Sequence, residues 1–171
     1  MRLTEYTQLT DIQRCLLDEA ERVMKTAYNP YSNFSVGAAF LAQDGRIISG
    51  SNVENAAYGS TICAERAAIL RANAMEIREF EQVAIIAVGK DFDTKDVTGP
   101  CGSCRQNLFE SSQVSRRNLE VIMSTTKKDK IVIATINELL PFGFGPNELN
   151  VDIRRYQSLP GPCGPGYTYE R

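Results

Sequence analysis

The spacing of apolar residues predicts an amphipathic helix over residues 10–27. Apolar positions recur at intervals of four, four, three and four residues, at Ile12, Leu16, Ala20, Val23 and Ala27. Thr10 or Asp11 can cap the N-terminus of this helix, because their side chains accept hydrogen bonds from its first backbone amides. We expect the helix to end at Asn29-Pro30, since proline cannot continue the hydrogen-bond ladder.

Apolar runs further along the chain predict strands. Residues 34–41 and 46–50 flank Asp44-Gly45, and an Asp-Gly pair between two apolar runs indicates a hairpin. Residues 83–88 are almost continuously apolar, as in a central strand covered on both faces. Residues 119–123 and 131–134 predict two more strands.

Helices are predicted between these strands. Residues 62–75 are rich in good helix formers and should form a largely buried helix. Shorter helices are expected over 101–110 and 136–140. This alternation predicts an α/β domain layered on one mixed sheet. We expect a solvated turn at 126–130, a polar surface insertion at 111–117, and a C-terminal stretch at 160–166 that is too rich in Gly and Pro to pack.

Length and charge narrow the class of protein. A chain of 171 residues with 43% hydrophobic residues builds one compact domain, which we expect over residues 1–150, followed by an extension at 151–171. Nineteen basic and 21 acidic residues leave a net charge of −2, so we expect no nucleic-acid partner. The chain shows neither a signal-peptide core nor a membrane-length apolar run, and its five cysteines suit a reducing compartment. We therefore expect a cytoplasmic protein.

The cysteines suggest a metal site. The sequence contains no histidine, which excludes catalytic triads and every zinc site that needs an imidazole. Cys63 begins one predicted helix, and Cys101 and Cys104 begin another, where the helix dipole favours thiolates. Together they offer zinc three ligands and leave the fourth position open, as in a catalytic site.

Three alternatives to an open zinc site stay possible at this point. Cys15 or Cys163 could close a structural zinc site, although one lies mid-helix and the other in a breaker-rich tail. Cys101 and Cys104 could instead form a redox pair, or the cysteines could be unrelated core residues.

Two residues beside Cys63 support the catalytic interpretation. Glu65 stands two residues after a ligand, close enough to move protons beside a metal without binding it. Zinc with three thiolates carries a net charge of −1, which disfavours ionisation of its water. Arg66 could offset this charge by hydrogen bonding to the thiolates, or could form an ordinary surface salt bridge.

The motifs resemble those of the small, three-cysteine cytidine deaminases. Cys63-Ala64-Glu65 and the run Pro-Cys-Gly-Ser-Cys-Arg-Gln at 100–106 carry the general zinc-deaminase signature. Segments 30–38, 52–58, 138–141 and 144–146 match further family segments in the same order. The resemblance covers about residues 11–149 and implies a three-layer α/β/α sandwich with a mixed central sheet of about five strands.

The resemblance also implies an activity and a set of site residues. The protein would deaminate cytidine and 2′-deoxycytidine for pyrimidine salvage, with one zinc ion per subunit held by Cys63, Cys101 and Cys104 and with Glu65 as the proton shuttle. It would work as a homotetramer whose subunits share active sites, with a small nucleoside as its substrate. Substrate-binding residues by resemblance are Phe34, Asn52, Glu54, Ala56, Tyr58, Ala64 and Phe144. Asn52 and Glu54 would hold the ribose, Phe34 would stack near the base, and Ala56, Tyr58 and Phe144 would act across subunits.

Other functions remain in competition. A blasticidin-S-type deaminase shares the zinc signature, but segment 52–58 resembles the cytidine group more closely. A polynucleotide-editing deaminase typically has histidine in place of Cys63. A catalytically silent, zinc-stabilised binding protein would have no chemical need for Glu65.

Overall fold

One mixed β-sheet organises the chain. The computed structural model describes residues 1–90, 94–153 and 156–157, so the expected Gly/Pro-rich stretch at 160–166 and Cys163 lie outside the described residues. The strands are β1 (Arg2–Thr4), β2 (Phe34–Ala42), β3 (Ile47–Ser51), β4 (Phe80–Gly89), β5 (Glu120–Ser124) and β6 (Ile131–Thr135). They lie in the order β1-β6-β5-β4-β2-β3, and only β4 and β5 pair in parallel. The described residues also form the 3₁₀ helices η1 (Tyr6–Gln8) and η2 (Tyr58–Ser60).

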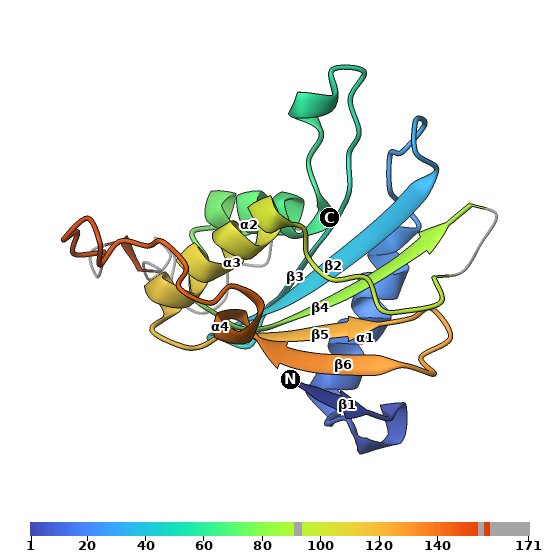
Figure 1. Cartoon of the computed structure of the whole chain (residues 1–171), viewed down its shortest axis with the longest axis horizontal. Helices are drawn as coiled ribbons and strands as arrows, with labels where there is room; N and C mark the ends of the chain where they lie inside the picture. The colour runs from blue at the N-terminus through green and yellow to red at the C-terminus, as the bar shows by residue number, and fades with distance from the viewer. Residues whose placement is uncertain (91–93, 154–155, 158–171) are drawn as a thin grey trace.

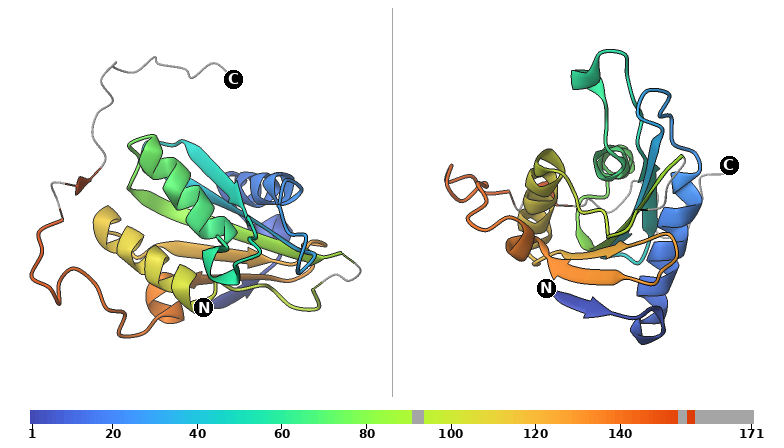
Figure 2. Two further views of the ribbon diagram at one scale, coloured as in Figure 1. Left: turned by 90° about the horizontal axis from the view of Figure 1, so that it is seen from above. Right: turned by 45° about the vertical axis from the view of Figure 1, so that its right-hand side comes forward.

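Helices cover both faces of this sheet, which confirms the three-layer α/β/α architecture. Helix α1 (Asp11–Met24) packs on one face, and α2 (Ala64–Ala74), α3 (Gly102–Ser115) and α4 (Ile136–Leu139) lie on the other (Figures 1 and 2). Side chains of β4 alternate between the two cores, with Val83 and Ile85 toward α2 and α3 and Ala84 and Ile86 toward α1. The apolar run at 83–88 therefore belongs to a strand buried on both faces, as predicted.

Among the residues that the structure describes, the sheet has six strands, one more than the resemblance implied. Strand β1 pairs antiparallel with β6, with Leu3 opposite Val132. It escapes prediction because its three residues are largely exposed and show no apolar alternation.

Helix α1 begins as predicted and ends earlier. Thr10 caps it reciprocally with Gln13: the Thr10 hydroxyl accepts from the Gln13 amide, and the Gln13 side chain accepts from the Thr10 amide. The helix ends at Met24, before the predicted residue 27, because Thr26 turns back and its hydroxyl bonds the Val23 carbonyl. Leu16, Ala20 and Val23 are buried as expected, but Ile12 is exposed.

Two expectations about burial were wrong. Helix α2 buries one face through small residues but leaves Leu70 exposed, so it is not largely buried. The segment expected as a polar insertion at 111–117 continues α3 to Ser115, and Ser111, Ser112 and Ser115 are buried. The hydroxyls of Ser111 and Ser115 bond carbonyls four residues earlier in the helix, which makes their burial possible. The turn at 126–130 is confirmed between β5 and β6.

Helix α2 lies very close to the sheet at Gly50 on β3. A Cβ atom at this position would lie 2.5 Å from the Ala68 amide nitrogen and 2.9 Å from the Ala64 carbonyl oxygen. Only glycine fits under the helix at this position. The close packing fixes the distance between the sheet and the N-terminus of α2, where Cys63 is the N-cap residue.

Candidate metal centre and substrate site

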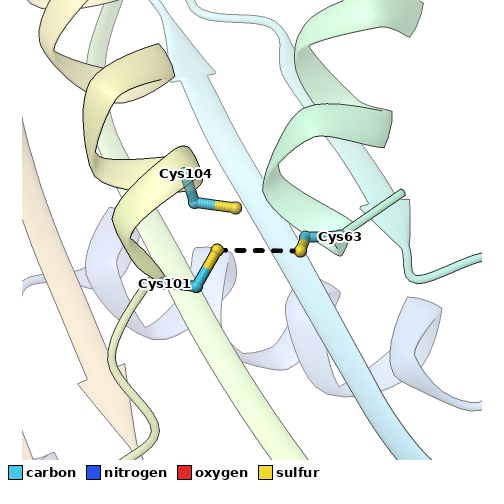
Figure 3. Close-up of side chains that lie close together, drawn as sticks. All are labelled: Cys63, Cys101 and Cys104. Atoms are coloured by element: carbon cyan, nitrogen blue, oxygen red, sulfur yellow. Dashed lines mark hydrogen bonds between the residues drawn. The ribbon is translucent and has the colours of Figure 1, made fainter. Parts of the chain in front are cut away.

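The three predicted ligand cysteines meet in space. Cys63 caps α2 and Cys101 caps α3, while Cys104 lies in the first turn of α3 (Figure 3). Their three Sγ atoms lie within 4.8 Å of one another, and those of Cys63 and Cys101 are 3.9 Å apart. Two thiolates on a tetrahedral zinc ion with bonds of about 2.3 Å stand roughly 3.8 Å apart, so this spacing fits zinc.

The electrostatics of the cluster also suit a cation. Hydrogen bonding from Cys104 lowers the pKa of Cys63 to about 5, with help from the Arg66 guanidinium. The same hydrogen bond raises the pKa of the buried Cys104. A metal ion would bind these sulfurs as thiolates.

Arg66 contacts the cluster, and no salt bridge joins it to another of the described residues. Its Nη2 atom donates to the Thr61 carbonyl at 2.7 Å and lies 3.9 Å from the Cys63 sulfur. Its buried Nε–H finds no hydrogen-bond acceptor among the described residues. A metal ion would keep the three cysteines deprotonated, and a thiolate could then accept a hydrogen bond from this unsatisfied donor.

Glu65 lies inside the site, on the first turn of α2. Its side chain is 3% exposed, and burial raises the pKa of its carboxyl above the usual range. Hydrogen bonding with Cys104 opposes part of this rise in the pKa. A buried carboxyl with a raised pKa holds a proton more readily than an exposed one, which suits a general acid and base.

The predicted ribose residues have structural partners of their own. Asn52 is 7% exposed, accepts a hydrogen bond from the Val36 amide at 2.8 Å and donates to the Phe34 carbonyl at 2.9 Å. Glu54 accepts from the Tyr31 and Ser32 amides, and hydrogen bonding by Ser32 lowers the pKa of its carboxyl. Asn52 thus supports the start of β2, and Glu54 supports the loop that leads into it.

The residues expected to act across subunits lie on exposed segments. Residues 54–61 project from the body of the molecule, and the Tyr58 ring there is 72% exposed and meets Tyr31 edge-on at 5.8 Å (Figure 1). Ala56 is also exposed, and Phe144, after α4, is 57% exposed. Within the described part of the chain, no hydrogen bond or ring contact joins Tyr58 or Phe144 to the cysteines. Ala64 is buried at the start of α2.

The motif at 100–106 also contains contacts that sequence reasoning missed. Arg105 donates to the Pro100 carbonyl and the Leu139 carbonyl, both at 2.9 Å, and so ties α3 to α4. Gln106 donates to the Phe144 carbonyl. Only their adjacency to Cys104 in the sequence could have drawn attention to them.

Comparison with known proteins identifies the family. Residues 10–119 match the family described as the cytidine and deoxycytidylate deaminase zinc-binding region. The chain belongs to this family. The three-cysteine cluster could hold the zinc ion of this family.

Individual deaminases agree with this assignment over most of the chain. Cytidine deaminase from Sporosarcina psychrophila is 39% identical over 140 residues, which cover 82% of this chain and 96% of that protein. The crystal structure of cytidine deaminase from Burkholderia pseudomallei superposes with a TM-score of 0.69 at 36% identity, and covers 80% of this chain and all of that one. Cytidine deaminase from Mycobacterium tuberculosis gives a TM-score of 0.64 at 34% identity, with 80% and 99% coverage. No helix in the described ranges has the length and apolarity that a membrane span requires.

Proposed function

We propose that the protein is a cytoplasmic cytidine deaminase of pyrimidine salvage. It hydrolyses cytidine and 2′-deoxycytidine to uridine and 2′-deoxyuridine and releases ammonia. The observation that carries this proposal is the convergence of three cysteine sulfurs within 4.8 Å beside a buried carboxyl, Glu65. The catalytic domain spans residues 1–150, and residues 151–171 are an extension.

Cys63, Cys101 and Cys104 would hold one zinc ion per subunit, and Arg66 would temper the charge of the thiolates. When bound, zinc supplies Lewis acidity that makes a water molecule nucleophilic at neutral pH. The water attacks C4 of cytosine, a C4–O bond forms and the C4–N bond to the amino group then breaks. Glu65 accepts the proton that the water loses and delivers it to ring nitrogen N3. It then takes the proton of the new C4 hydroxyl and passes it to the amino group, which leaves as ammonia while the C4=O bond of the product forms.

The substrate would be held by residues from more than one subunit. Phe34 stacks near the base and Ala64 lines its pocket, while Asn52 and Glu54 bind the sugar hydroxyls. Asn52 keeps a second amide hydrogen and a second lone pair for this contact, beyond the two it uses within the chain. Ala56, Tyr58 and Phe144, all exposed in one chain, act at neighbouring sites of a homotetramer.

A continuous ultraviolet assay with cytidine tests the activity. The wild-type protein should convert cytidine, whereas Glu65→Gln should keep its zinc and lose at least about a thousand-fold in kcat, because proton transfer at two positions is lost. Glu76→Gln, which alters an exposed carboxylate just beyond the other end of α2, is the matched control and should retain full activity. Zinc-loaded wild-type protein that leaves cytidine unchanged would overturn the proposal. Ultracentrifugation tests the tetramer, whose mass should be four times the 19.0 kDa of the chain.

A further inference from the structure

Helix α3 has a second face that contacts the chain after α4. Cys104 points toward the other cysteines, while Gln106, two residues later, lies about 200° around the helix. The Gln106 Nε2 atom donates a hydrogen bond to the Phe144 carbonyl at 2.7 Å. The same helix therefore carries two of the predicted zinc ligands and one anchor of residues 141–146, here named the C-terminal arm.

Phe109, one turn further along α3, packs against the backbone of the arm. A Cβ atom at Gly143 would lie 2.9 Å from the Phe109 Cδ2 atom, and one at Gly145 would lie 2.8 Å from its Cε1 atom. The arm backbone thus lies against the ring at two positions that no larger residue can occupy without displacing it. The Gly145 amide also donates to the Glu148 carboxylate at 2.8 Å.

The arm combines a restrained backbone with an exposed ring. The carbonyl of Phe144 is held by Gln106, and the glycines on either side of it rest on Phe109, yet the Phe144 side chain is 57% exposed. Fixing a backbone in this way costs conformational entropy. Because the Phe144 ring is exposed, its burial within the chain does little to offset this cost. Such preorganisation favours binding when the ring packs against a partner, because less conformational entropy is then lost on association.

We propose that Gln106 and Phe109 are positioning residues that aim Phe144 at the substrate site of a neighbouring subunit. The zinc-bearing helix of one subunit then sets substrate affinity at the next. This inference rests on the proposed function, in which Phe144 acts across subunits. In this proposal Gln106 and Phe109 act only through the arm that they contact.

Gln106→Met tests the proposal, because methionine keeps the length of the side chain and removes the donor. We expect KM for cytidine to rise about five-fold, the equivalent of one hydrogen bond of ~1 kcal/mol, with kcat within two-fold and zinc content unchanged. In a Glu65→Gln background, which removes turnover, cytidine affinity measured by calorimetry should fall by the same factor. Phe109→Leu, which keeps an apolar support but loses the flat ring, should also raise KM. An unchanged KM in both variants would overturn the inference.

Subunit mixing separates an effect across subunits from a local one. Tagged Gln106→Met subunits, which have an intact Glu65, are assembled with an excess of Glu65→Gln subunits, which have an intact arm. The KM of the mixed tetramer should return toward the wild-type value. Mixing with the double variant Glu65→Gln/Gln106→Met should leave KM high. If KM stays equally high in both mixtures, the arm acts only within its own chain and the inference fails. If the wild-type protein does not deaminate cytidine at all, the proposed function fails instead.

Discussion

Asn52 supports the start of β2, where Phe34 lies, and removal of its side chain should cost stability as well as substrate affinity. Its side chain joins two backbone groups of β2, the Val36 amide at 2.8 Å and the Phe34 carbonyl at 2.9 Å. Asn52→Ala leaves both groups without this partner in a partly buried region. A residue that only bound ribose would have no such effect on the free protein.

The expected magnitude follows from these two bonds. Each lost hydrogen bond costs about 1–1.5 kcal/mol of unfolding free energy, so the variant should be less stable by about 2–3 kcal/mol. For a chain of this size, 1 kcal/mol lowers Tm by about 2–4 °C, which gives a fall of roughly 4–12 °C. KM for cytidine should rise in parallel, because the end of β2 that bears Phe34 loses two of its hydrogen bonds and the proposed contact of Asn52 with the sugar is lost.

Calorimetric melting of zinc-saturated protein at a fixed concentration measures the stability effect, and initial rates measure KM. Glu54→Gln is the matched control, since an amide oxygen can still accept from the Tyr31 and Ser32 amides. It should raise KM while keeping Tm within about 2 °C of the wild-type value. An Asn52→Ala protein that melts within about 2 °C of wild type would refute the structural role that we assign to this side chain.

Two further substitutions test the surroundings of the cysteine cluster. Arg66→Gln should weaken zinc binding about 10- to 100-fold in competition with a chromophoric chelator, because the thiolates lose a charged donor. Arg46→Gln, on the exposed hairpin, serves as its control. Equal zinc affinities of the two variants would refute a role of Arg66 in stabilising the thiolates. Gly50→Ala should destabilise the fold by more than about 2 kcal/mol in denaturant unfolding, because its Cβ would lie 2.5 Å from the Ala68 amide nitrogen. Gly59→Ala, where a Cβ meets open space, should be nearly neutral, and equal stability of the two alanine variants would contradict the close approach of α2.

Local sequence signals predicted most elements of the fold because their causes are local. The capping box of Thr10 and Gln13 and the Asp-Gly turn at residues 44 and 45 involve neighbours in the chain. Strand β1 has no such signal, since its partner, β6, lies more than 120 residues away. The burial of Ser115 was missed for a related reason. Its hydroxyl donates to the Ser111 carbonyl and accepts from the Phe80 amide, and the second contact comes from a distant strand.

The sequence by itself determined the chemistry available to this protein. The absence of histidine, three cysteines at predicted helix starts and a glutamate two residues after the first of them left zinc-assisted proton transfer as the leading interpretation. Residue type and helix position are local properties, so both could be predicted from the sequence directly. Tertiary structure decided which side chains meet. The packing of α2 and α3 on one sheet face brings Cys63 to Cys101 across 38 residues, and the return of the chain over α3 brings Phe144 to Gln106. These distances depend on how the layers pack, and no local pattern in the chain encodes them.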